Sequence, residues 1–137
     1  MEDRKEVNAM ANYVSCNIEV IRDNIDEVIN YLKSDEMPLD FNQLIKQPEG
    51  LTDEESHDWR VENWGTRCNA SSVTVNRASD DCVVYDFVTV NAEPRPIVEA
   101  LAKSFPDAFI EYEYSDDAGW SEYFTDRYAK GKLIEKK

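Results

Sequence analysis

The chain has 137 residues, of which 42% are hydrophobic, and this is enough apolar material for one domain with its own core. It carries 29 acidic and 15 basic side chains, a net charge of −14, and such a surface repels phosphate backbones and anionic lipids. Composition and charge therefore argue against wholesale disorder and against direct binding of DNA, RNA or a membrane surface.

The three cysteines, Cys16, Cys68 and Cys82, are scattered along the chain, and the only histidine is His57. Structural zinc sites need four such ligands in close pairs, so we predict free thiols in a reducing compartment, with no metal and no cofactor. The polar N-terminus does not resemble a secretory signal, and no apolar run reaches the roughly 18 residues that span a bilayer. We therefore expect a cytoplasmic protein.

Residues 1–9 show no periodicity and are expected to form a mobile tail before a single domain at residues 10–137. Residues 13–21 alternate and are rich in β-branched side chains, which predicts a first strand. Asp23 is the expected N-cap of an amphipathic helix. Its apolar stripe is formed by Ile25, Val28, Ile29 and Leu32.

Residues 39–45 are expected to form a short extended segment. The sequence T-D-E-E at residues 52–55 is typical of a helix start, since acids in the first turn interact favourably with the helix dipole. This helix is expected to run to residue 59. Residues 72–76 and 81–90 are β-rich and separated by a polar turn, which predicts a hairpin.

Pro94 and Pro96 predict the start of a second long helix, which Pro106 ends. Residues 109–114 alternate between an apolar side and a side that carries Glu111 and Glu113. Residues 121–128 are expected to form a last strand before a lysine-rich end. The order of elements predicts an α+β fold: an antiparallel sheet with two main helices on one face, in a ferredoxin-like split βαβ arrangement.

Four segments carry a family resemblance: M-A-N-Y-V-S-C-N-I-E-V at residues 10–20, D-F-N-Q-L-I at 40–45, N-W-G-T-R-C-N-A at 63–70, and the helix segment at 96–107. They resemble, in the same order, the M-x-N-W-C-S-N-x-L-x-V, D-F-N-K-I-I, N-W-G-T-K-W-N/D-A and F-P-D segments of the YubB-like ferredoxin-fold family. This chain departs from the pattern at Tyr13, Cys16 and Cys68. The resemblance implies a ferredoxin-like fold and an origin on phages, plasmids or prophages, and it implies no activity.

No catalytic motif is present. His57 lies in a run of acids without a nucleophile beside it, and the sequence has no G-x-S-x-G segment or glycine-rich phosphate loop. Neighbouring carboxylates such as Asp80 and Asp81 are expected by chance in so acidic a chain. We therefore predict that the protein is not an enzyme.

Two stretches, residues 47–59 and 104–126, contain five and seven acids and no lysine or arginine. They could present a continuous negative surface on the solvated side of the sheet. In N-W-G-T-R-C-N-A, either Trp64 packs beneath a tight turn at Gly65, or Trp64 and Arg67 form a recognition loop. The predicted partner-binding residues are Glu111, Glu113, Asp116, Asp117, Glu122, Asp126, Asp53, Glu54, Glu55, Trp64 and Arg67.

These features favour a non-enzymatic protein of a mobile genetic element that binds a basic host protein through its acidic face. Glu111 and Glu113 would lie about 6.7 Å apart on a strand, which is comparable to the spacing of phosphates along one DNA strand. The partner would then be a nucleic-acid-binding nuclease of a defence system, inhibited by a DNA mimic of the anti-CRISPR or anti-restriction type. The alternative is an interaction or regulatory module without mimicry, dimeric through its sheet, and acids that serve only solubility remain a third interpretation.

Overall fold

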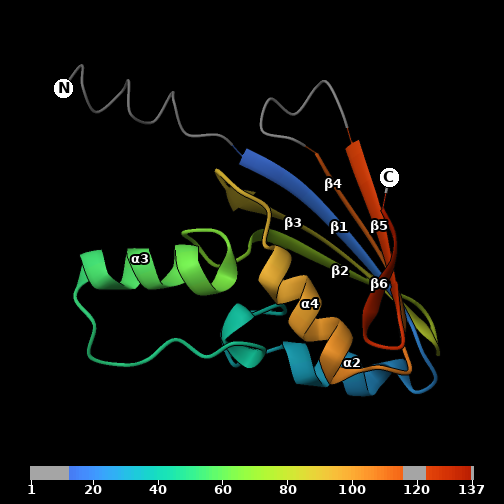
Figure 1. Cartoon of the computed structure of the whole chain (residues 1–137). Helices are drawn as coiled ribbons and strands as arrows, with labels where there is room; N and C mark the ends of the chain where they lie inside the picture. Colours follow the sequence, from blue (N-terminus) through green and yellow to red (C-terminus); the bar gives the residue numbers. More distant parts are fainter. Residues whose placement is uncertain (1–12, 116–122, 137) are drawn as a thin grey trace.

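The computed structural model describes residues 13–115 and 123–136, and within these ranges it is a six-stranded antiparallel sheet covered by helices (Figure 1). The elements along the chain are β1 (Tyr13–Ile21), α2 (Ile25–Leu32), the 3₁₀ turn η1 (Phe41–Gln43), α3 (Asp53–Trp64), β2 (Ser71–Ser79), β3 (Cys82–Val90), α4 (Arg95–Ser104), β4 (Phe109–Ser115), β5 (Tyr123–Ala129) and β6 (Lys132–Lys136). The strand order is β2-β3-β1-β4-β5-β6, with each neighbouring pair antiparallel. The predicted α+β class with an antiparallel sheet is confirmed.

Alternation along β1 and β3 separates a buried face from an open face. On β1 the buried side chains are Val14, Cys16, Ile18 and Val20. Ile18 lies opposite Tyr85 on β3 and Tyr112 on β4, and both tyrosines are buried. The apolar stripes of α2 and α4 cover this face, and Figure 1 shows the helices together on that side of the sheet. The other face has no helix over it among the described residues.

Most of the predicted elements are confirmed. The first strand has the predicted bounds, residues 72–90 form a hairpin, and the helix behind Pro94 buries its predicted face. Helix α3 ends at Trp64, five residues beyond the expected end, and Gly65 follows it in a left-handed conformation with φ 84°. A Cβ at this glycine would lie 2.7 Å from Cδ of Pro96, so both the turn and the packing require glycine.

Three further expectations about elements differ from the structure. Residues 39–45 are not extended, because the Asp40 side chain caps the 3₁₀ turn by accepting from the Asn42 amide at 2.9 Å. Asn24, in a left-handed conformation with φ 57°, takes the N-cap position expected for Asp23. Strand β6 was not expected, and the predicted tail at residues 1–9 lies outside the described residues.

None of the described helices has the length and apolar character that crossing a bilayer requires.

Candidate functional site

The open sheet face carries acids on three adjacent strands. Asn17 on β1 lies between Asp86 on β3 and Glu113 on β4, each its direct partner in the register. One pair further along β1, Glu19 lies directly opposite Glu111. Like charges placed opposite each other on one face destabilise a sheet. The centre of this face, which we call the acidic sheet face (Glu19, Asp86, Glu111 and Glu113), therefore concentrates negative charge.

Cations neutralise only one side of the acidic sheet face. Arg127 on β5 contacts Glu111 through Nε and Nη2, both at 2.8 Å, and Glu135 on β6 through Nη1 at 2.8 Å. Glu19, Asp86 and Glu113 have no ion pair among the described residues. These three carboxylates are therefore the ones available to a cationic partner.

Neutral groups hold two of these carboxylates in place. Asn17 Nδ2 donates to Asp86 Oδ1 at 2.7 Å, and the Cys82 thiol donates to Glu19 Oε2 at 3.5 Å. Partial burial, together with the neighbouring Glu19 carboxylate, raises the pKa of the Cys82 thiol. The thiol therefore stays protonated at neutral pH, and adds no further negative charge to the face.

A depression of about 220 Å³ opens on the acidic sheet face, and its lining residues are Ser15, Cys16, Asn17, Asp86, Glu113 and Tyr123. The Tyr123 side chain at its edge is 65% exposed. Two exposed carboxylates and an aromatic ring are the groups that bind an ammonium or guanidinium ion. The depression thus has the chemistry to hold a lysine or arginine side chain.

Asp126, a predicted member of the contact surface, does not belong to it. Its partner in the register is Tyr112, so its side chain points to the helix-covered side and is 0% exposed. There it forms an ion pair with Arg95 at the start of α4. The prediction that Asp126 contacts a partner is therefore wrong, because the pleat directs this acid into the core.

Arg95 connects α4 to the sheet through a cluster of polar contacts. Its Nη1 donates to the hydroxyl of Tyr128 at 2.8 Å and its Nη2 to that of Tyr114 at 3.2 Å. Its Nε donates to Glu93, which also accepts from the Tyr112 hydroxyl at 2.6 Å. Burial works against the charge of Arg95, but Glu93 and Asp126 outweigh it and raise the pKa of the guanidinium. The cluster explains why an acid is tolerated in the core.

The acids of α3 belong to a different part of the molecule. Glu55 completes a capping box with Thr52, its Oε1 accepting from the Thr52 amide at 3.0 Å. Asp53 and Glu54 are exposed in the first turn of α3, which lies on the helix side of the sheet (Figure 1). As far as residues 13–115 and 123–136 show, the acids of α3 are therefore not continuous with those of the acidic sheet face. Asp116, Asp117 and Glu122 lie outside the described residues.

Trp64 is 1% exposed, with its Nε1 donating to the Ile45 carbonyl at 2.8 Å and its ring edge-on to Phe41. This confirms the interpretation of a tight turn above a packed tryptophan, and excludes Trp64 as an exposed anchor. Arg67 is half-buried, and its carbonyl accepts from Arg60 Nε.

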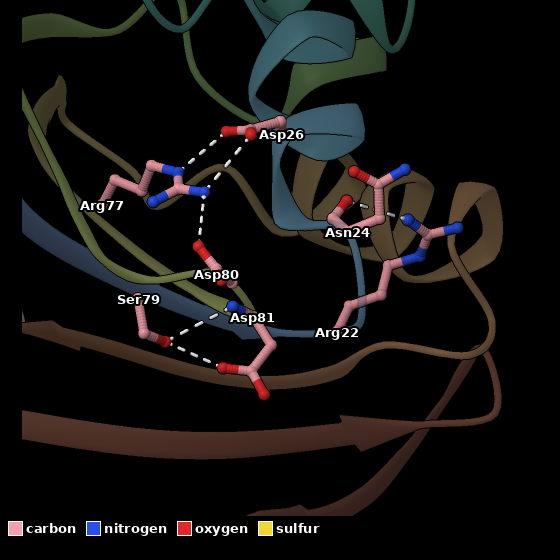
Figure 2. Close-up of polar contacts among 7 residues, drawn as sticks. All are labelled: Arg22, Asn24, Asp26, Arg77, Ser79, Asp80 and Asp81. Atoms are coloured by element: carbon pink, nitrogen blue, oxygen red, sulfur yellow. Dashed lines mark hydrogen bonds and ion pairs between the residues drawn. The ribbon is translucent and has the colours of Figure 1, made fainter.

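A second group of acids lies at the corner where the β2–β3 turn meets the start of α2 (Figure 2). Arg77 bonds Asp26 at 2.8 Å and Asp80 at 3.0 Å. Arg22 bonds Glu27 and Asp107, each at 2.9 Å, beside a depression of about 360 Å³. Because two arginines pair with four of its acids, this corner offers a cationic partner less free charge than the acidic sheet face does.

Sequence reasoning missed Glu19 and Asp86, although both follow from alternation, since each stands between two buried residues of its strand. Within residues 13–115 and 123–136, no three His, Cys, Asp or Glu side chains come together in a way that could hold a metal ion.

Neither a protein-family model nor a curated protein matches the chain. Among solved structures, it is similar to protein api92 from Yersinia pseudotuberculosis, described as a DUF1281 family protein, with a TM-score of 0.59 and 16% sequence identity. The match covers 72% of this chain and 38% of api92, so the chain corresponds to well under half of that protein. At this identity the likeness shows a shared α+β fold and nothing about activity.

Proposed function

We propose that this chain is a non-enzymatic, cytoplasmic protein that binds a basic protein through its acidic sheet face. The observation that carries the proposal is the group Glu19, Asp86 and Glu113, three carboxylates on adjacent strands without an ion pair among the described residues. A positively charged surface would neutralise them on contact and would be steered towards them from solution.

The cost of this arrangement supports a binding role. Solubility requires charges somewhere on the surface, but it does not require Glu19 directly opposite Glu111. Opposed like charges reduce the stability of a sheet, and stability given up locally is common where a surface serves binding. A cationic partner would remove this repulsion.

The depression beside Asp86 and Glu113 gives the contact a specific anchor. A lysine or arginine of the partner would place its charge between the two carboxylates and its aliphatic part against the exposed Tyr123 ring. Phe109 and Ile21, exposed at the ends of β4 and β1, would add apolar area to the same contact. Mixed acidic and aromatic surfaces of this kind suit basic protein partners.

We further infer a ferredoxin-like split βαβ core, extended by β5 and β6. The order β2-β3-β1-β4, with α2 and α4 on one face, supports this inference. Together with the YubB-like sequence segments it favours a protein of a phage or plasmid. In that setting the partner would be a nucleic-acid-binding defence nuclease of the host, and the acids would occupy its phosphate-binding groove.

The alternative is an interaction or regulatory module without mimicry, and one form of it, a dimer through the open sheet, is less consistent with the charge. Two copies packed face to face would bring Glu19, Asp86 and Glu113 against the same residues of the second copy. Such a contact leaves like charges unpaired and partly desolvated.

The test is a competition experiment. Basic proteins that the immobilised chain captures from host lysate would be identified and purified, and their binding to labelled nucleic acid measured while the chain is added. Displacement of the nucleic acid, reduced at higher salt, would support mimicry. Binding without displacement would support the interaction module. Capture that does not weaken with salt would contradict a role for the acidic sheet face.

A further inference from the structure

A pocket of about 280 Å³ lies between α3 and the loops on either side of it, away from the acidic sheet face. Its lining residues are Asn42, Gln47, Arg60, Trp64, Cys68 and Asn69. No carboxylate is among them, whereas the depressions at Arg22 and at Asn17 are lined by three and two acids. A depression beside Arg67 also lacks lining acids, but its lining is mainly apolar, whereas the pocket at Arg60 is lined by a guanidinium and three amide side chains.

Arg60 is the charged group of this pocket. Its Nε donates to the Arg67 carbonyl and its Nη1 to Gln47 Oε1 at 3.4 Å, and no ion pair joins it to an acid of the described residues. The residues one turn away on α3 are Ser56, His57, Asn63 and Trp64, so the acids of this helix lie on its other sides. A guanidinium has five N–H donors, so three N–H groups of Arg60 have no hydrogen-bond acceptor among the described residues.

The amide oxygens around Arg60 each accept at least one hydrogen bond from the protein. Asn42 Oδ1 accepts from the Gln47 amide at 2.9 Å, and Asn69 Oδ1 accepts from the amides of Phe41 and Ala70. Gln47 Oε1 accepts from Arg60 itself. The NH2 groups of these three amides each donate one hydrogen bond and keep a second N–H. With the N–H groups of Arg60, the unused donors of the pocket therefore outnumber its unused acceptors, and the pocket suits a ligand rich in acceptors.

Asp40 is a carboxylate hydrogen-bonded to two residues of the pocket lining, Asn42 and Asn69, but is not itself part of the lining. Its Oδ1 accepts from Asn69 Nδ2 at 2.9 Å and from the Asn42 amide at 2.9 Å. Burial opposes its charge, but these hydrogen bonds outweigh burial and lower the pKa of Asp40. Its Oδ1 is thus engaged by the pocket amides, and Asp40 forms no ion pair with Arg60.

We propose that this pocket binds a compact oxyanion, a carboxylate or a phosphate, of a small molecule. The Arg60 guanidinium supplies the charge and the paired donors that such groups prefer, and the half-buried thiol of Cys68 lies in the same pocket. The proposal is independent of the function of the sheet face, because the two sites share none of their lining residues.

The Cys68 thiol serves as a reporter of the pocket, and Cys82 on the acidic sheet face is its internal control. Iodoacetamide, a neutral reagent, alkylates the protein in phosphate, acetate or chloride of equal ionic strength, and mass spectrometry follows each cysteine. We expect phosphate or acetate to slow alkylation of Cys68 at least about twofold relative to chloride, with Cys82 unchanged. Protection by phosphate alone would identify a phosphate site, and protection by acetate alone a carboxylate site. Equal rates in all three salts would overturn the proposal.

Charge selectivity gives a second readout. Iodoacetate carries a carboxylate, so the ratio of its rate to that of iodoacetamide should be higher at Cys68 than at Cys82, whose neighbour is Glu19. In Arg60→Gln the ratio at Cys68 should fall severalfold, whereas Arg60→Lys should keep part of it. Arg77→Gln, which changes an exposed arginine on β2, is the matched control. A ratio at Cys68 that is the same in wild type and in a folded Arg60→Gln variant would contradict anion binding by Arg60.

Discussion

Glu19 on β1 lies directly opposite Glu111 on β4, and of the two only Glu111 forms an ion pair within the described part of the chain, with Arg127 at 2.8 Å. The chain therefore keeps an unneutralised carboxylate at the centre of its sheet. Repulsion within this pair should be strongest at low salt, where screening is weakest.

The first prediction follows from this pair. Glu19→Gln removes the repulsion while keeping a similar shape, so the melting temperature should rise at low ionic strength and the gain should shrink as salt is added. Arg127→Gln should do the opposite, because it leaves Glu111 and Glu135 without their cation. Thermal unfolding followed by circular dichroism tests both variants. A melting temperature lowered by Glu19→Gln at low salt would refute the assignment of strain to this pair.

The second prediction concerns the buried ion pair of Asp126 and Arg95. Asp126→Asn removes the buried one of the two carboxylates that pair with Arg95, leaving Glu93 alone, and should cost about 3 kcal/mol of unfolding free energy. Glu113→Gln makes the same acid-to-amide change at an exposed position of β4 and should have little effect on the unfolding free energy. Urea denaturation measures both, and a similar small loss for the two variants would show that Arg95 does not depend on Asp126.

The third prediction concerns the tight turn after α3. Gly65→Ala combines a left-handed conformation with a contact of 2.7 Å to Pro96, so it should cost clearly more than the roughly 1 kcal/mol of the conformation alone. Gly50→Ala is the matched control, since Gly50 has the same φ of 84° and open space around it. Equal losses of unfolding free energy in the two variants would show that the contact with Pro96 adds nothing to the cost at Gly65.

The fourth prediction concerns acid unfolding. The pKa of Asp40 is lower in the folded protein than its ordinary value of 3.8, so the protonated form is favoured more in the unfolded chain. Asp40 therefore contributes stability above that ordinary value, and this contribution is lost as the pH falls through the folded pKa. In Asp40→Asn, the unfolding free energy should decline less steeply with acid than in wild type. Parallel pH profiles for the two proteins would exclude this role of Asp40.

Local patterns in the sequence predict much of this fold. The apolar positions of Ile25, Val28 and Leu32 face the sheet as their helical spacing predicts, and β1 is recovered with its exact span from alternation alone. Strand β6 was hidden because its lysines suggested a solvated end, yet Lys130 and Gly131 both adopt positive φ and form a tight hairpin turn. The Lys130–Gly131 turn is therefore the sequence feature that could have predicted β6.

The site was less predictable than the fold because it depends on register. The position of Asp126 follows from its pairing with Tyr112, and its cation comes from Arg95, which lies 31 positions earlier on another element. Asp86 and Glu113 meet across β1 although they belong to separate segments of the chain. Charge runs along the sequence therefore pointed to acids in general, but only strand pairing shows which acids share a face.

The central claim is that position on the acidic sheet face, rather than net charge, determines partner binding. The most direct test is the affinity for the captured basic protein, measured by titration calorimetry for Asp86→Asn/Glu113→Gln and for Asp53→Asn/Glu54→Gln. Each variant removes two exposed charges, the first pair from the sheet face and the second from α3. We predict at least a tenfold loss of affinity, about 1.4 kcal/mol, for the first variant and less than about twofold for the second. Equal losses in both variants, or no loss in the first, would contradict the account.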